Sequence, residues 1–268
     1  MRNTVAGSAI SEGVMKQRVI SGVFVAIVTI ASAYFGGLLL KGVLTFVGVW
    51  GSYEFIKIRK EKFNWILYVI MTATVMTVFF FHNLSQAIML LEIVILMSIA
   101  VFDKNESFDD VCSTFLMSMM LGHATYFMSY VQSMNKWMFG YVLIAAMLTD
   151  TFAYFVGVKF GKHKLNSRIS PNKTIEGSLG GWFFGALFSF IWAYLFRFFG
   201  MDMLIFIVAS LFLPIVSQIG DLTFSLIKRH YGVKDFSNLI PGHGGILDRL
   251  DSNIFCIILF GALIILFA

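Results

Sequence analysis

Long apolar runs separated by short polar stretches fill the chain from Val19 to its end. Nine of the runs are long enough to cross a bilayer as helices. They cover residues 19–35, 38–56, 64–81, 86–102, 108–130, 137–159, 178–198, 203–228 and 253–268. The pattern predicts an all-α polytopic integral membrane protein with about nine transmembrane helices. A count of eight stays open, because only Gly36 and Gly37 separate the first two runs and the last run is short.

The composition argues against a separate soluble domain. Of 268 residues, 58% are hydrophobic and 13% are charged, which is far more apolar than a soluble core requires. Cys112 and Cys256 lie in apolar runs without metal-ligand spacing, so they indicate neither a disulfide framework nor a zinc site. The residues from Ala31 to Ala33 imitate a signal-peptide cleavage site, but the apolar runs that follow favour an uncleaved first helix.

The basic residues are distributed unevenly between the two sides of this arrangement. Of the 20 Lys and Arg residues, all but Lys41, Lys136 and Arg197 fall on the side of the N-terminus. Short basic loops stay in the cytoplasm, so the N-terminus is predicted to be cytoplasmic. The net charge of +5 then reflects topology and attraction to anionic lipid, and no nucleic-acid partner is expected. The lack of a transit-like N-terminus favours a bacterial inner (plasma) membrane.

The membrane segments change character near Trp137. Before it, Glu54 and Glu92 are the main ionisable residues in apolar runs, whereas Asp150 and Asp221 lie well inside later ones. A carboxylate at the centre of a membrane helix costs roughly 2.5 to 3.5 kcal/mol, so it usually faces a hydrated cavity. We therefore interpret residues 1–136 as a scaffold, and residues 137–268 as the part that carries a catalytic cavity and two cytoplasmic loops. The alternative is that each Asp pairs with a buried cation and braces the bundle.

The first basic loop runs from Gly161 to Gly177. Its segment from Ser170 to Thr174, followed by Glu176, is typical of an ordered turn that leads into a helix N-terminus, where free backbone N–H groups bind anions. A basic cytoplasmic loop with a good helix cap explains the same residues about equally well.

The second polar stretch, Ser225 to Asp251, is denser in charge. Asp248 and Asp251 stand three apart and would share a helix face, with Arg249 pointing elsewhere. Together with Asp221 they form a set of three carboxylates suited to Mg²⁺. An isolated Asp-Arg-Leu-Asp would equally form a solvated, salt-bridged helix start. The glycines at 242, 244 and 245 would let the backbone approach a phosphate closely, or would simply form a turn.

Taken together, the two stretches resemble the signature of the phosphatidate cytidylyltransferase (CDP-diacylglycerol synthase) family. The second stretch carries the resemblance in Ser225, Lys228-Arg229, Lys234-Asp235, Pro241 to Gly245 and Asp248 to Asp251. Asp150, Ala153-Tyr154, Gly157, Gly161-Lys162 and Ser170 to Gly177 resemble a second block of the same family, and Lys16 to Arg18 its N-terminal motif. The resemblance is loose from Lys16 to Asp251 and close in the two blocks.

The resemblance implies an enzyme that transfers the cytidylyl group of CTP to phosphatidate, giving CDP-diacylglycerol and pyrophosphate, with its active site facing the cytoplasm. It implies Mg²⁺ as cofactor, with room for a second cation, membrane lipid as partner, and a homodimer as a candidate assembly. The expected catalytic residues are Asp221, Lys228, Asp248 and Asp251, with Asp221, Asp248 and Asp251 as metal ligands. The expected substrate-binding residues are Asp150, Tyr154, Lys162, Ser170, Lys173, Thr174, Glu176, Ser225, Arg229, Lys234, His243, Gly244, Gly245 and Arg249.

Two other functions fit parts of the pattern. A CTP-dependent lipid or polyprenol kinase would use similar metal and nucleotide chemistry but would transfer the γ-phosphoryl group. A transporter of an anionic solute would use Asp150 and Asp221 as coupling groups, although no inverted repeat supports it.

Overall fold

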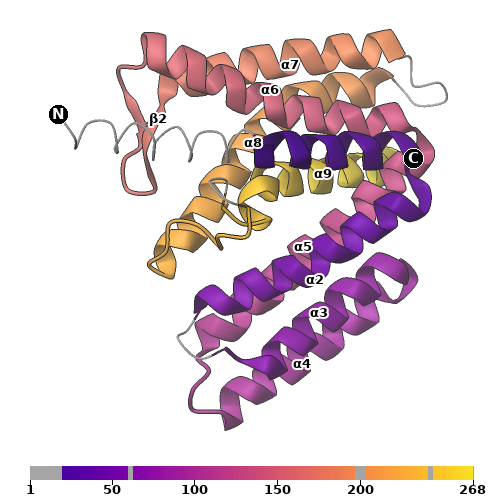
Figure 1. Ribbon diagram of the computed structural model, residues 1–268, viewed down its shortest axis with the longest axis vertical. Coiled ribbons are helices and arrows are strands. Elements are labelled where there is room, and N and C mark those ends of the chain that lie inside the picture. The colour runs from indigo at the N-terminus through magenta and orange to yellow at the C-terminus, as the bar shows by residue number, and fades with distance from the viewer. Residues whose placement is uncertain (1–19, 60–62, 197–202, 241–243, 268) are drawn as a thin grey trace, which may run out of the picture.

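The computed structural model describes residues 20–59, 63–196, 203–240 and 244–267. Within these ranges the chain forms nine long helices and one small β-hairpin (Figure 1). A first helix spans Ile20–Phe35. The other elements are α2 (Gly37–Arg59), α3 (Trp65–Phe80), the 3-10 turn η1 (His82–Leu84), α4 (Ser85–Phe102), α5 (Phe108–Met134), α6 (Lys136–Phe160), β1 (Lys164–Asn166), β2 (Ser170–Thr174), α7 (Ile175–Phe196), α8 (Met203–His230) and α9 (Leu247–Phe267). The predicted all-α architecture is confirmed.

Most of these helices have the length and composition of membrane spans. Six are long and apolar enough to cross a bilayer: α2, η1 with α4, α6, α7, α8 and α9. Ile20–Phe35 and α3 are apolar but shorter, and α5 is long but more polar, with Ser, Thr and His along its length. Large apolar side chains face outward, such as Leu38, which is 88% exposed, and Phe102, which is 85% exposed. The chain is therefore a polytopic membrane protein.

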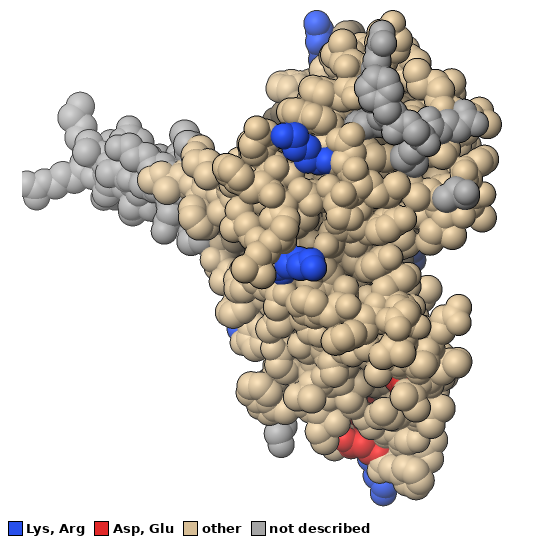
Figure 2. Space-filling model, turned by 90° about the vertical axis from the view of Figure 1, so that its right-hand side faces the viewer, with Lys and Arg blue, Asp and Glu red and all other residues tan. Residues whose placement is uncertain are grey.

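Charged side chains are sparse on part of the surface. Figure 2 shows the end of the bundle that lies on the right in Figure 1, where only a few Lys, Arg, Asp and Glu side chains are visible. The β-hairpin lies at the opposite, left-hand end of α6 and α7 in Figure 1. The sparse charge on this face is compatible with the predicted distribution of Lys and Arg, and the sidedness of the protein stays a prediction.

The helices form two groups that meet along α5 and α9. The pair α6 and α7 packs against α8, and α8 packs against α9. On the other side, α2 and α3 pack against α5, and α4 lies at the edge of the molecule against α3 and α5 (Figure 1). The contact between α5 and α9 joins the groups, and the buried core includes Leu121 on α5 and Phe260 on α9.

Local sequence explains where several helices begin and end. Gly36 and Gly37 both adopt positive φ, 59° and 54°, so the first apolar run breaks there into two helices. The side chain of Asn64 accepts hydrogen bonds from the first turn of α3, and Ser107 with Asp110 forms a capping box at the start of α5.

The hairpin of β1 and β2 differs from the simple turn expected between Ser170 and Thr174. Lys164 pairs with Thr174 and Asn166 pairs with Ser170 in antiparallel register. Thr174 also accepts a hydrogen bond from the backbone N–H of Gly177 through Oγ1, at 3.1 Å. The hairpin therefore leads directly into α7 and places Lys173 next to the membrane helices.

A seam of glycines brings α6 and α7 into backbone contact. A Cβ atom on Gly177 would lie 2.6 Å from the carbonyl oxygen of Ala153, and one on Gly181 would lie 2.6 Å from that of Thr149. Neither position leaves room for a methyl group. Small residues allow this close approach of helices in membranes, so the two helices form one wall of the molecule.

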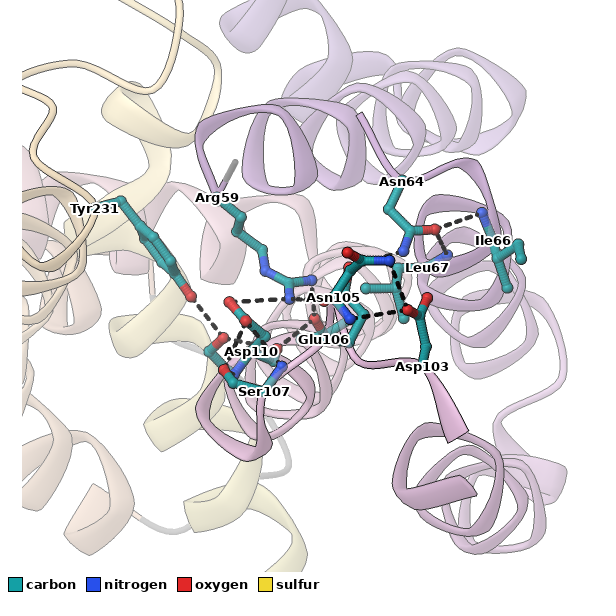
Figure 3. Close-up of polar contacts among 12 residues, drawn as sticks. Arg59, Asn64, Ile66, Leu67, Asp103, Asn105, Glu106, Ser107, Asp110 and Tyr231 are labelled. Atoms are coloured by element: carbon teal, nitrogen blue, oxygen red, sulfur yellow. Dashed lines mark hydrogen bonds and ion pairs between the residues drawn. The ribbon is translucent and has the colours of Figure 1, made fainter. Parts of the chain in front are cut away.

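A buried ion-pair network joins the C-terminal end of α2 to the loop before α5 (Figure 3). Arg59 donates through Nη2 to Glu106 at 3.0 Å and lies 3.3 Å from Asp110. Its Nη1 donates to Thr114 at 2.6 Å, and Asn64 donates to the other oxygen of Glu106 at 2.8 Å. Because these charges are almost fully buried, their removal would leave partners uncompensated, so the network fixes α2 against α5.

The cytoplasmic side of the protein can be tested by labelling. The hairpin and the α5–α6 turn lie at opposite ends of α6, a helix of 25 residues, which is long enough to span a bilayer. We expect a cysteine at exposed Lys234 to react only with reagent on the cytoplasmic side, and one at exposed Ser133 only with reagent on the opposite side. Both would be introduced into a Cys112→Ser, Cys256→Ser background. Labelling of both positions from one side would contradict the predicted topology.

Candidate active site

A cavity of about 930 Å³ opens between α6, the hairpin, α7, α8 and α9. Its lining runs in sequence from Met147 to Asn253, within the part of the chain interpreted above as catalytic. Apolar side chains such as Met147, Val158 and Leu165 share the lining with carboxylates and ammonium groups. A cavity of this size with both polar and apolar side chains in its lining suits a ligand that has a charged head and a hydrocarbon body. The division of the chain at residue 137 itself stays a prediction.

Many of the residues singled out in the sequence meet in this cavity. They are Asp150 and Tyr154 from α6, Lys173 and Thr174 from β2, Asp221 and Lys228 from α8, and Asp248, Arg249 and Asp251 from α9. Arg249 lines the cavity as well, but it is exposed whereas Asp248 is buried, and the expectation that it points away from Asp248 and Asp251 stays a prediction. All three lie in the first turns of α9 at the edge of the cavity, so they reach it together.

Other predicted binding residues do not line the cavity in the described part of the chain. Lys162 and His163 donate their backbone N–H groups to the Glu176 carboxylate, at 3.0 and 3.2 Å. Arg229 donates to the carbonyl oxygen of Val233 at 2.9 Å. The remaining ones are Ser170, Ser225, Lys234, Gly244 and Gly245, and His243 lies outside the described residues. Their predicted roles in substrate binding stay predictions.

Three carboxylates from three helices line the cavity. Asp150, Asp221 and Asp251 are close enough to interact electrostatically. Ser252 donates its hydroxyl to Asp150 at 3.0 Å, and Lys173 of the hairpin forms an ion pair with Asp221. The cluster therefore combines three like charges with the ammonium groups of Lys173 and Lys228, an arrangement common at functional sites.

Asp248 has a different environment. Its Oδ1 accepts a hydrogen bond from Lys228 Nζ at 2.7 Å, and its Oδ2 accepts from the backbone N–H groups of Phe236 and Gly245, at 2.8 and 2.9 Å. Both oxygens are thus engaged within the protein. Among the described residues, no group of three His, Cys, Asp or Glu side chains is arranged to hold a metal ion. The predicted set of Asp221, Asp248 and Asp251 as metal ligands is therefore not assembled in this structure and stays a prediction.

The two alternatives for the intramembrane carboxylates coexist. Asp221 pairs with Lys173, as bracing would require, yet both residues line the cavity and are only about a quarter exposed. Lys228 and Asp248 likewise pair and line the cavity. Ion pairs at the edge of a polar cavity can exchange a carboxylate for a phosphate. Pairing here is therefore compatible with ligand binding.

The glycines before α9 leave room for two carboxylate side chains of the protein itself. Gly244 has a φ of +83°, and a Cβ atom there would lie 2.8 Å from Oδ2 of Asp248. A Cβ atom on Gly245 would lie 2.5 Å from Oε1 of Glu54. The close approach at these two positions is therefore to side chains of α9 and α2, and a role of the two glycines in substrate binding stays a prediction.

The sequence analysis missed several residues of the cavity. The polar ones that received no role are Thr151, Lys164, Asn172, Ser178, Gln218, Asp235, Ser252 and Asn253, of which Asp235 was quoted only as part of a motif. Ser252 and Asn253 could have been found, because they follow Asp251 directly and interrupt the last apolar run. Ser178 could not, since it joins the cavity through hydrogen bonds with Gln218, 40 residues away on α8.

The fold and the cavity define an α-helical membrane protein with a charged cavity between its C-terminal helices. The model of the Cytidylyltransferase family matches residues 16–267, and the chain belongs to this family. It is 32% identical over 257 residues to the phosphatidate cytidylyltransferase of Bacillus subtilis strain 168, covering 90% of this chain and 94% of that protein. It is 41% identical over 172 residues to the phosphatidate cytidylyltransferase of Staphylococcus aureus strain COL, covering 64% and 66% of the two chains. These relatives agree with the resemblance seen in the sequence.

Proposed function

We propose that this protein joins CTP and phosphatidate to give CDP-diacylglycerol and pyrophosphate, as a step of phospholipid biosynthesis. The observation that carries the proposal is the cavity itself: in a member of the Cytidylyltransferase family, its lining combines carboxylates, ammonium groups and apolar side chains from the helices. A nucleotide and a lipid headgroup need such a site, where charge and hydrocarbon are accommodated together.

In this reaction a phosphate oxygen of phosphatidate attacks the α-phosphorus of CTP, and pyrophosphate leaves. A phosphomonoester is already anionic at neutral pH, so the protein needs to supply little acid–base chemistry and acts mainly by positioning and charge stabilisation. Lys173, Lys228 and Arg249 line the cavity and would contact the phosphates as cationic hydrogen-bond donors. Tyr154 and Met147 would contact the lipid.

The charges of the cavity support a divalent cation. The lining contains five acidic side chains (Asp150, Asp221, Asp235, Asp248 and Asp251) and four basic ones (Lys164, Lys173, Lys228 and Arg249). A triphosphate would therefore enter a site without excess positive charge. Asp221 and Asp251 fit Mg²⁺, because hard carboxylate oxygens are its preferred protein ligands, and Asp248 would join them on release from Lys228. Bound Mg²⁺ would neutralise charge on the reacting phosphates.

The proposed location is the inner membrane of a bacterium, with the cavity open to the cytoplasm. The relatives named above are bacterial, and the basic residues of the hairpin and of the α8–α9 loop lie on the side that the charge distribution assigns to the cytoplasm. Assembly as a homodimer is part of the same proposal.

The direct test is turnover of radiolabelled CTP by the purified protein in detergent. We expect a labelled lipid product and free pyrophosphate only when phosphatidate and Mg²⁺ are both present, with dCTP as an alternative nucleotide, and no product after chelation of Mg²⁺. Equal turnover with ATP would contradict the assignment.

The same assay separates the other candidate functions. A lipid or polyprenol kinase would release CDP and would leave the cytidine label in solution. A transporter would move an anionic solute into proteoliposomes without any nucleotide. Either result would replace the proposed function.

A further inference from the structure

The loop between α8 and α9, residues 231–246, carries no regular secondary structure of its own beyond one isolated bridge in its described part. It nevertheless leads into the first turn of α9, which brings Asp248, Arg249 and Asp251 to the cavity. Their placement depends on what holds the junction between the loop and the helix. Asp248 holds one side of it through the N–H groups of Phe236 and Gly245.

Glu54 of α2 holds the other side. Its Oε1 accepts hydrogen bonds from the hydroxyl of Ser237 at 2.5 Å and from the N–H of Ile246 at 3.0 Å. Its Oε2 accepts from the N–H of Leu247 at 3.0 Å. The residue is 0% exposed, and these three donors all come from the α8–α9 loop and the start of α9. Glu54 does not line the cavity.

The position of this carboxylate matches a specific need of α9. The first N–H groups of a helix have no partner within the helix, and a negative charge beside them is favourable. Gly245 and Ile246, which precede α9, carry no side-chain acceptor. Glu54 therefore acts as the cap of α9 from another helix, and Gly245 is needed because any Cβ atom there would collide with it.

The helix that carries Glu54 is itself anchored. Arg59, five residues further along α2, is held by Glu106 and Asp110 (Figure 3). The hydroxyl of Tyr231, at the start of the α8–α9 loop, lies 2.7 Å from that of Ser113 on α5. The loop is thus connected to α5 at its start, through Tyr231, and to α2 at its end, through Glu54.

We infer that Glu54 is a positioning residue for the transfer reaction. It would set the orientation of the first turn of α9, and with it the places of Arg249 and Asp251 in the cavity, without touching either substrate. The inference rests on the proposed function for its kinetic consequence, but its structural consequence can be measured without any turnover.

The test is the Glu54→Gln variant of the full-length protein in detergent. Glutamine keeps the shape of the side chain but turns an amide NH₂ toward N–H or O–H donors, so one or more of the three hydrogen bonds is lost. We expect amide hydrogen exchange in the peptide of residues 244–250 to become at least about tenfold faster. We also expect kcat to fall by about tenfold to a hundredfold, with the KM for CTP changing less, because a displaced catalytic group costs rate.

Two further variants make the result decisive. Glu92→Gln is the matched control, since Glu92 is another buried glutamate of residues 1–136. It accepts a hydrogen bond from Ser118 on α5 and makes no hydrogen bond to the described part of the α8–α9 loop. It should leave exchange in residues 244–250 and kcat unchanged at temperatures well below melting. Ser237→Ala removes only one donor and should shift both readouts in the same direction by less, which also tests the inference if Glu54→Gln does not fold.

The inference would be overturned if amide hydrogen exchange in residues 244–250 were as slow in Glu54→Gln or in Ser237→Ala as in the wild-type protein. So would equal changes in Glu54→Gln and Glu92→Gln, since a general loss of stability would then explain both. Absence of turnover in the wild-type protein would overturn the proposed function instead, and the exchange measurement would still decide the role of Glu54.

Discussion

Asp251→Asn should lower turnover per folded molecule by roughly a hundred- to a thousandfold, the usual effect of losing one electrostatic contact to a transition state. Asp251 lines the cavity close to Asp150 and Asp221, and the hydrogen bond found for its side chain comes from the adjacent N–H of Ser252 at 2.8 Å. The exchange keeps the shape and removes the charge, so little of the fold depends on it. Asp221→Asn should have a similar effect and should also release Lys173.

The measurement is the initial rate with labelled CTP, together with the melting temperature of each purified variant. If these carboxylates bind Mg²⁺, a large excess of Mg²⁺ should recover part of the rate. Asp109→Asn serves as the control, because Asp109 is exposed on the first turn of α5, away from the cavity. Turnover close to that of the wild type in both cavity variants, with lowered melting temperatures, would show that the two carboxylates brace the helices.

The pair of Lys228 and Asp248 should behave differently, because removing either residue should damage both folding and turnover. Their side chains are 11% and 3% exposed and lie 2.7 Å apart. Loss of one partner from such a buried pair typically costs about 3 to 5 kcal/mol, since the other charge is left without compensation. Lys228→Met and Asp248→Asn should therefore each lower the free energy of unfolding by about this amount.

The double variant separates the structural part from the catalytic part. Lys228→Met with Asp248→Asn removes both charges, so its melting temperature should lie above that of the single variants, as expected for coupled residues. Its turnover should remain as low as theirs, because the cavity then lacks Lys228, the cation proposed to contact phosphate, and the carboxylate of Asp248. Recovery of turnover together with stability would contradict a role for this pair in the reaction.

The helices were predictable from the sequence because an apolar run of about 20 residues can form few stable structures other than a membrane helix. The observed start of α9 shows the limit of that reasoning. The last apolar run was predicted from residue 253, whereas α9 begins at Leu247. Asp248, Arg249 and Asp251 interrupt the hydrophobic pattern, and they are helical because the carboxylates and N–H groups at the helix start satisfy one another. The charged residues that indicate the site are thus the same ones that made the start of α9 unpredictable from hydrophobicity.

The members of the site were predictable only where charge stands out against apolar sequence. Asp150, Asp221 and Lys173 were found in this way, and the structure places them together. The function of Glu54 was not predictable, because its partners Ile246 and Leu247 lie more than 190 positions away in sequence, and no local pattern encodes such a contact. The β-hairpin was missed for the related reason that its strands are short and polar.

The glycine seam between α6 and α7 restricts how lipid can reach the cavity. Because main-chain atoms of the two helices are in contact at Gly177 and Gly181, sliding or separating them would break many small contacts at once. The two helices should therefore move together as one rigid body. The neighbouring junction of α7 with α8 relies on side chains such as Ser178 and Gln218, which can reorient individually. Lipid that enters the cavity from the bilayer should thus pass between α7 and α8. The rigid pair of α6 and α7 would meanwhile keep Asp150 in its place in the cavity.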